Sequence, residues 1–283
     1  MYRLSAFADE ASQNISEQVE AMRRNGISLL EIRGVDGTNI SKIDASKARE
    51  VKNILDANGM SVWSMGSPVG KKSLADDFDG QIDSFKRLLE NTDILGAKRI
   101  RLFSFYPIEG EGRAETLKKV VERLNVFTEL TPEHITLCHE NEKKIFGENI
   151  ENCLAIHKAI PSIRAVFDPA NFIQCGVNTL EAWEALKDYV DYLHIKDALP
   201  DGTIVPAGNG IGNISAIASD YLARGGSVMT LEPHLKVFSG LSELEAGGES
   251  LKAMKNIYRS NDEAFDAAVI ALKNILDCKE TLS

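Results

Sequence analysis

Short β-type runs alternate with helical patterns along the whole chain, and this alternation constrains the fold more than any other feature. Each run is followed by a segment whose apolar residues have helical spacing. The predicted strands cover residues 2–8, 29–33, 61–65, 100–105, 135–140, 163–168, 191–197 and 228–232, and the predicted helices cover 14–26, 45–57, 79–95, 112–129, 150–160, 179–188, 212–224 and 248–278. Asn14, three positions before Glu17, is the predicted cap of the first helix.

Eight strands that are each followed by a helix predict an α/β fold, in which a parallel sheet closes into a single (β/α)8 barrel. No linker or break in composition divides the sequence, so we expect residues 1–283 to form one domain. The first strand–helix turn has no G-x-G-x-x-G pattern, which removes support for a dinucleotide-binding half. Residues 236–249 have the composition of a loop insertion that could fold over the mouth of the barrel.

The composition narrows the possible partners. Hydrophobic residues make up 43% of the chain and charged residues 26%, as in an ordinary globular protein. The net charge of −10 argues against nucleic acid, because binding to phosphates relies on Lys and Arg. The four cysteines show no C-x-x-C spacing, and we find neither a signal peptide nor an apolar run of the ~20 residues that span a membrane. We therefore expect a cytoplasmic protein without a membrane partner.

Four polar residues stand at the ends of predicted strands, namely Glu140, Asp168, His194 and Glu232. Catalytic residues of such barrels lie at the carboxyl ends of the strands. The intervening positions, Leu137, Phe167, Leu193 and Leu231, are apolar and suit the helix layer. The four polar side chains should therefore point towards one axis. His139 is the exception, because its position faces the helices.

Three carboxylates and an imidazole that converge without a counter-charge would repel one another, and a divalent metal would resolve this. The oxygen-rich ligand set suits Mn²⁺, with Mg²⁺, Co²⁺ or Zn²⁺ as alternatives. Lys196 lies beyond His194 on the same face and could neutralise charge on a substrate oxygen. The competing interpretation is that the carboxylates cap helices and that His194 is a structural histidine.

Earlier strands also turn polar residues inwards, and interior salt bridges explain these residues as well as substrate contact does. They are Glu31, Arg33, Ser64, Arg101 and Ser104. A separate run, Gly208 to Gly212, precedes a predicted helix and could bind an anion through its backbone amides.

Five segments make the chain similar to the xylose isomerase-like TIM-barrel superfamily of sugar isomerases and epimerases. They are residues 137–142, 167–172, 193–197, 206–210 and 230–234. The N-terminal segment Phe7–Glu10 also resembles the sequences of this superfamily. The resemblance implies metal ligation by Glu140, Asp168, His194 and Glu232. Two departures concern positions that contact substrate in relatives: Glu142 and Asn171 stand where many relatives have His. Glu142, Asn171, Lys196, His234 and Arg33 are the predicted substrate-binding residues.

The resemblance implies an isomerase or epimerase that moves a proton next to the carbonyl of a sugar, sugar phosphate or polyol, through an enediolate. Glu140 and Glu232 would be its acid–base pair. One alternative is a lyase that dehydrates a keto-inositol or a related polyol. A metal endonuclease is disfavoured by the five His and the net charge, and a sugar-binding barrel without activity is the remaining class. A homo-oligomer is possible.

Overall fold

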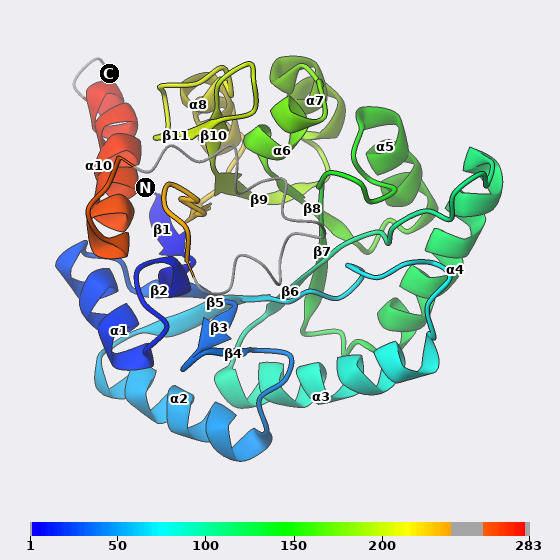
Figure 1. The fold of residues 1–283 in the computed structure, drawn as a ribbon, viewed down its shortest axis with the longest axis horizontal. Coiled ribbons are helices and arrows are strands. Elements are labelled where there is room, and N and C mark those ends of the chain that lie inside the picture. The colour runs from blue at the N-terminus through cyan, green and yellow to red at the C-terminus, as the bar shows by residue number, and fades with distance from the viewer. Residues whose placement is uncertain (1, 239–256, 281–283) are drawn as a thin grey trace.

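The computed structural model describes residues 2–238 and 257–280, and these form a closed parallel barrel surrounded by helices (Figure 1). The strands follow one another around the barrel in the order β1-β12-β9-β8-β7-β6-β5-β2. Their bounds are Arg3–Ala6 (β1), Leu29–Ile32 (β2), Ser61–Gly66 (β5), Arg99–Leu102 (β6), Thr136–Glu140 (β7), Arg164–Phe167 (β8), Val190–Ile195 (β9) and Val228–Leu231 (β12). The predicted (β/α)8 barrel is confirmed.

The helices that cover the strands lie where the sequence predicts them, with one difference near the carboxyl terminus. They are Ile15–Arg24 (α1), Ala45–Ala57 (α2), Asp79–Leu95 (α3), Arg113–Leu130 (α4), Ile150–Ala159 (α5), Thr179–Leu186 (α7), Ile214–Ala223 (α8) and Asn261–Glu280 (α10). The Asn14 side chain accepts hydrogen bonds from the Ser16 and Glu17 amides, as its predicted capping role requires. The prediction of helix over 248–278 is wrong for residues 257–260, and residues 239–256 lie outside the described part of the chain.

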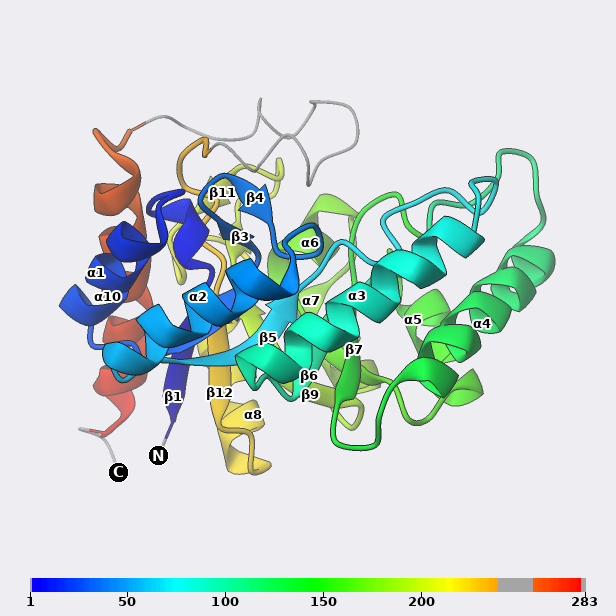
Figure 2. The ribbon, with the colours of Figure 1, turned by 90° about the horizontal axis from the view of Figure 1, so that it is seen from below.

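Several short elements at the mouth were not predicted. They are the helix α6 (Pro169–Gln174), the 3-10 turn η1 (Ala8–Glu10), and two hairpins, β3 (Gly34–Val35) with β4 (Thr38–Asn39) and β10 (Asp197–Ala198) with β11 (Ile204–Val205). Figure 2 shows α6 and both hairpins at the same end of the barrel. They are too short for a periodic pattern. Instead, α6 begins where the Asp168 side chain accepts the Asn171 amide and Pro169 occupies the first turn.

Side-chain parity along the strands separates two apolar regions. Leu137, Phe167, Leu193 and Leu231 belong to the large core between strands and helices. Cys138, Val166 and Tyr192 form a small cluster inside the barrel, with Trp63 packed against it. The predicted alternation is therefore confirmed, and Cys138 is an interior filler.

Among the described residues, no helix combines the length and the apolar character needed to cross a bilayer.

Asp197, which follows β9, organises the glycine-rich run after it. Its Oδ2 accepts the Gly208 and Gly210 amides at 2.9 and 3.1 Å, and its Oδ1 accepts the Ala198 and Gly212 amides at 2.9 and 2.8 Å. The residue is 1% exposed. The glycines leave room for this contact, since a Cβ on Gly210 would lie 2.3 Å from Asp197 Oδ1. The backbone amides that were predicted to bind an anion therefore bind the side-chain carboxylate of Asp197.

Replacement of Asp197 should destabilise the protein strongly. The Asp197→Ala variant leaves four amides around a buried site without their acceptor, so we expect a loss of about 3 kcal/mol or more in the free energy of unfolding. Asp44→Ala is the matched control, because Asp44 caps α2 through a single bond to the Lys47 amide, and such caps are worth about 1 kcal/mol. Urea unfolding would measure both. Equal losses would contradict the organising role.

Candidate functional site

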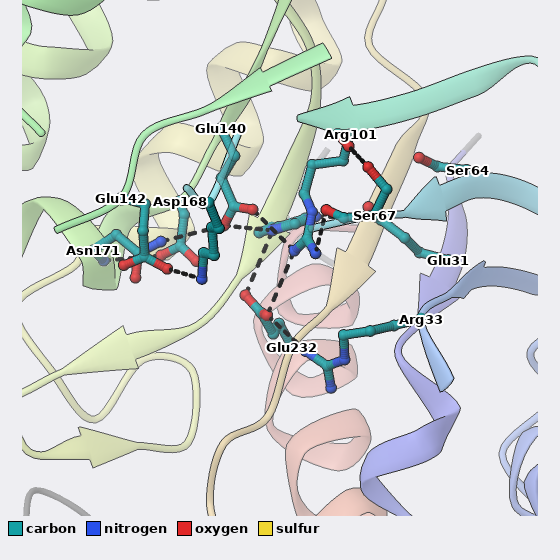
Figure 3. Close-up of polar contacts among 12 residues, drawn as sticks. Glu31, Arg33, Ser64, Ser67, Arg101, Glu140, Glu142, Asp168, Asn171 and Glu232 are labelled. Atoms are coloured by element: carbon teal, nitrogen blue, oxygen red, sulfur yellow. Dashed lines mark hydrogen bonds and ion pairs between the residues drawn. The ribbon is translucent and has the colours of Figure 1, made fainter. Parts of the chain in front are cut away.

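Four polar side chains converge where the strands end. Glu140 ends β7, Asp168 follows β8, His194 lies in β9 and Glu232 follows β12. One ligand atom from each lies within 4.8 Å of the others, and all four residues are buried. Figure 3 shows Glu140, Asp168 and Glu232 approaching from separate strands. The predicted convergence is thus present.

The two ring nitrogens of His194 have different partners. Nδ1 lies 3.1 Å from Glu140 Oε1 and 3.5 Å from Glu232 Oε2, whereas Nε2 lies 3.0 Å from Glu31 Oε2. Glu31 also accepts a 2.8 Å hydrogen bond from the Tyr192 hydroxyl, which in turn lies 3.1 Å from Ser64 Oγ. The ring is therefore oriented from behind by Glu31, with Nδ1 towards the carboxylates.

Amide side chains connect the neighbouring strand ends. Asn141 donates to the Asp168 carbonyl and accepts the Asp168 amide, both at 2.9 Å. Asn171 Nδ2 donates to Glu140 Oε1 at 3.2 Å and to the Asn141 carbonyl at 2.9 Å. Glu140 and Asp168 are thus held in a fixed relation to each other.

Buried cations lie among the carboxylates. The prediction that these carboxylates converge without a counter-charge is therefore wrong. Arg101 donates to Glu140 Oε2 at 3.0 Å, and Arg33 donates to Glu232 Oε1 at 3.0 Å (Figure 3). The Lys196 ammonium lies 2.9 Å from Asp168 Oδ2 and 3.0 Å from Glu232 Oε2. The carboxylates therefore have counter-charges, and mutual repulsion alone does not require a metal.

The surroundings shift the pKa values of these groups in different directions. Burial raises the pKa of Asp168 to about 7, despite attraction to Lys196. Burial would also raise the pKa of Glu232, but contacts with Lys196, His234 and His194 lower it well below its ordinary value. The pKa of His194 lies well above its usual range, because Glu140 and Glu31 outweigh the effect of burial. Carboxylates at both ring nitrogens therefore favour the protonated form of His194.

Two of the predicted substrate-binding cations are already engaged by protein groups. Lys196 bridges Asp168 and Glu232, as described above. Arg33 uses four N–H groups, one on Glu232, two on Asp9 and one on Glu10, and it is 2% exposed. Arg33 and Arg101 were predicted as inward residues, but their pairing with these particular carboxylates was not.

The other three predicted contacts surround the cluster. Asn171 holds Glu140, while Glu142 pairs with Lys71 at 2.9 Å. His234 Nε2 lies 3.4 Å from Glu10 Oε1 and 3.5 Å from Glu232 Oε1, without a hydrogen-bond partner. Their contact with substrate stays a prediction. Asp9, Glu10 and Lys71 were not predicted, because their strand-end or loop positions carry no periodic signal.

The remaining histidines lie away from this cluster. His139 is buried in the helix layer, as its parity predicts, and packs edge-on against His157 with ring centroids 5.7 Å apart. His134 is paired with Asp93 near the surface. The clustered histidines expected of a metal endonuclease are therefore not present among these residues, which lie within the described part of the chain.

A closed parallel barrel whose polar cluster lies at the carboxyl ends of its strands has the layout of a (β/α)8 enzyme scaffold. A family model described as the xylose isomerase-like TIM barrel matches residues 19–257. The chain therefore belongs to the xylose isomerase-like TIM barrel family, which confirms the resemblance. No curated protein matches the sequence significantly.

Solved structures of similar fold include proteins with different described activities. The IolI protein with a bound zinc atom has a TM-score of 0.73, with 17% identity over 98% of this chain and 99% of that chain. D-psicose 3-epimerase from Clostridium cellulolyticum H10 has 0.71, with 14% identity over 97% and 98%. The probable 3-DHS dehydratase AsbF from Bacillus anthracis has 0.71, with 16% identity over 97% and 99%. At these identities the likeness establishes the fold.

Arg101 should be essential to the stability of the metal-free site. The Arg101→Met variant keeps much of the side chain but leaves the buried Glu140 carboxylate without this cation, so we expect a loss of about 3–5 kcal/mol in the free energy of unfolding. Arg113→Met is the matched control, because Arg113 pairs with Glu151 where both side chains are exposed, and such pairs contribute about 0–1 kcal/mol. Urea unfolding in the presence of a chelator measures both losses. A loss for Arg101→Met as small as the control's would refute the role.

Proposed function

We propose that this protein is a metal-dependent isomerase or epimerase of a small sugar or polyol, with Glu140, Asp168, His194 and Glu232 holding the metal. The observation that carries the proposal is the orientation of His194. A metal-binding histidine usually donates its second ring N–H to a carboxylate, and Glu31 supplies that carboxylate.

The residues fit a divalent ion in a second respect. Asp168 Oδ2 is buried and accepts no hydrogen bond of good geometry, although the Lys196 ammonium is near. Three carboxylates and one imidazole suit Mn²⁺, and we propose it before Mg²⁺, Co²⁺ or Zn²⁺. A cytoplasmic location, a homo-oligomeric state and a single domain over 1–283 stay predictions.

Glu140 and Glu232 are proposed to move the proton. They come from β7 and β12, which β8 and β9 separate in the barrel, so the two carboxylates can reach opposite faces of a bound substrate. When bound, the metal would supply Lewis acidity at the substrate carbonyl. One glutamate takes the proton from the carbon next to the carbonyl, and the other returns a proton to the opposite face, which inverts that carbon. Asn171 and Arg101 hold Glu140 in place for this transfer.

Dehydration of a keto-inositol or related polyol is the second candidate, and the dehydratase-like neighbour of the same fold favours it. The first proton removal would be the same. The enolate would then re-form the carbonyl and a double bond between the α- and β-carbons, and the hydroxyl group on the β-carbon would take a proton from the protonated glutamate and leave as water. Mass spectrometry of the product separates these reactions, because dehydration lowers the mass by one water and epimerisation leaves it unchanged. A panel of ketoses and keto-inositols incubated with the metal-loaded protein in D₂O provides the samples.

Metal binding should depend on Glu31 although it is not a proposed ligand. We expect Glu31→Gln to weaken Mn²⁺ binding about 10–100-fold, because the amide holds the His194 ring less firmly. Tyr192→Phe is the graded control, since it removes one hydrogen bond to Glu31 and leaves the Glu31–His194 contact in place. Competition with a fluorescent chelator measures the affinities. Unchanged Mn²⁺ affinity in a folded Glu31→Gln variant would reject this role.

Glu140→Gln and Glu232→Gln should each lower turnover about 10²–10⁴-fold while metal remains bound, because an amide oxygen can still ligate but cannot exchange a proton. Substrate α-proton exchange in D₂O and metal stoichiometry measure the two properties separately. Glu111→Gln is the control, because Glu111 lies in the loop before α4 and pairs with Lys119 of that helix, not with a residue of the polar cluster. Normal turnover in either site variant, with metal bound, would contradict the assignment of that glutamate as an acid–base residue.

A further inference from the structure

A second group of buried polar side chains lies next to the polar cluster and shares one residue with it. Its members are Glu10, at the end of the turn η1, Glu232, and His234 in the segment after β12. One ligand atom from each lies within 4.8 Å of the others, and all three residues are buried. We call this group the Glu10 triad.

The imidazole of His234 points into the Glu10 triad without a partner. Its Nε2 is buried and has no hydrogen-bond partner among the described residues, and the residue is only 9% exposed. The same atom lies 3.4 Å from Glu10 Oε1 and 3.5 Å from Glu232 Oε1. A buried polar atom without a partner costs free energy, and a bound ion is one explanation of such an atom.

The spacing of these atoms suits a tetrahedral ion. Zn²⁺ is bound at about 2.0–2.2 Å by histidine nitrogens and carboxylate oxygens, most often in tetrahedral geometry. Ligand atoms at the corners of such a tetrahedron lie about 3.3–3.6 Å apart. The distances of 3.4 and 3.5 Å from His234 Nε2 to the two carboxylates fall within this range. Two carboxylates and one imidazole leave a fourth position open.

Other contacts hold the Glu10 triad in this arrangement. The His234 amide donates to Glu10 Oε2 at 2.6 Å, and the His234 ring stacks on Phe238 with ring centroids 5.6 Å apart. Arg33 donates to Glu10 Oε1 at 3.1 Å and to Glu232 Oε1 at 3.0 Å. A carboxylate oxygen has two lone pairs, so these bonds leave one lone pair on each oxygen for an ion. The ligand atoms are therefore in place before an ion arrives.

The charge of the surrounding network attracts a further cation. Buried ion pairs join the Glu10 triad to the polar cluster. Within the described part of the chain, this network holds six carboxylates and three Lys or Arg side chains, namely Asp9, Glu10, Glu31, Glu140, Asp168 and Glu232 with Arg33, Arg101 and Lys196. The adjoining Glu142 is balanced by Lys71. One divalent ion beside a neutral His194 still leaves a negative charge, so a second cation is attracted to the network.

Glu232 turns its two oxygens to different neighbours. Oε2 faces the polar cluster, 3.0 Å from the Lys196 ammonium and 3.5 Å from His194 Nδ1. Oε1 faces the Glu10 triad, 3.5 Å from His234 Nε2 and 3.0 Å from the Arg33 guanidinium. Each oxygen of this carboxylate can therefore ligate a different ion.

We propose that Glu10, Glu232 and His234 bind a second divalent cation, for which Zn²⁺ has the fitting geometry, and that Glu232 bridges it to the metal of the polar cluster. The site itself stands on the geometry of the Glu10 triad, whereas its effect on turnover rests on the proposed function. Glu232 can exchange a proton only through an oxygen that no metal occupies. An ion in the second site takes that oxygen, so filling of the site inhibits turnover.

Replacement of three buried histidines by phenylalanine, one at a time, tests the second site. Each protein is freed of metal with a chelator and dialysed against Zn²⁺, and its zinc content per chain is measured. We expect two ions in the wild type and one in His234→Phe, which keeps a ring against Phe238 but has no ligand atom. His194→Phe should keep only the ion of the Glu10 triad. His139→Phe is the matched control with two ions, because His139 is also buried with an unpartnered Nε2 but lies in the helix layer.

Affinity and turnover provide two further measurements. In calorimetric titration, His234→Phe should weaken binding of the second ion by more than the about 10–100-fold that loss of a residue orienting a ligand costs. Wild-type turnover should fall about 10²–10⁴-fold as the second site fills, since a general acid or base usually contributes that much. Excess Zn²⁺ should not lower the turnover of His234→Phe from its own maximum.

The outcomes separate the second site from the proposed function. A single wild-type ion that His194→Phe loses and His234→Phe keeps overturns the second site and leaves the proposed metal centre standing. A single ion with the opposite response supports the second site and overturns the proposed metal centre. Two ions without inhibition support the second site and contradict proton exchange by Glu232.

Anomalous diffraction from wild-type crystals soaked in Zn²⁺ locates the ions without any substitution. We expect one peak among Glu10, Glu232 and His234 and another among the ligands of the polar cluster. A map without the first of these peaks overturns the second site, even if every histidine variant fails to fold.

Discussion

Pairing of β1 with β12 closes the barrel, and every side chain of the site depends on that closure. Because all eight strands are parallel, their carboxyl ends meet at one mouth, and alternate residues point to the axis. A register shift between Leu30 and Glu31 interrupts the pairing of β2 with β5. Such irregularities re-aim side chains, and here the side chain that follows the shift is Glu31, which reaches His194.

Opposite charges alternate within the site, and their contacts hold its side chains in place. Arg101, Arg33 and Lys196 each contact at least one of the converging carboxylates, and all three are buried. Such contacts cost desolvation, and they persist only when the geometry satisfies most donors and acceptors. In the proposed reaction the same cations would restrict the directions from which a substrate can approach Glu140 and Glu232.

The fold and the four converging residues were predictable from the sequence for a simple reason. Strand parity has a period of two, so the apolar Leu193 and Leu231 place His194 and Glu232 on one face even when strand ends are misjudged by a residue. Long-range partners carry no such signal. The pairing of Arg101 with Glu140 depends on the proximity of β6 and β7 and on side-chain reach, and the contact of Asp197 with Gly210 depends on a loop path.

Asn141 has a thermodynamic consequence for any ion that binds here. Its side-chain amide forms two hydrogen bonds with the backbone of Asp168, so the carboxyl ends of strands β7 and β8 are held rigidly together. The conformational entropy of bringing Glu140 and Asp168 together is lost when the protein folds, not when a ligand arrives. For the proposed metal, the two carboxylates would form a preformed chelate, so that the entropic cost of bringing them together is met during folding.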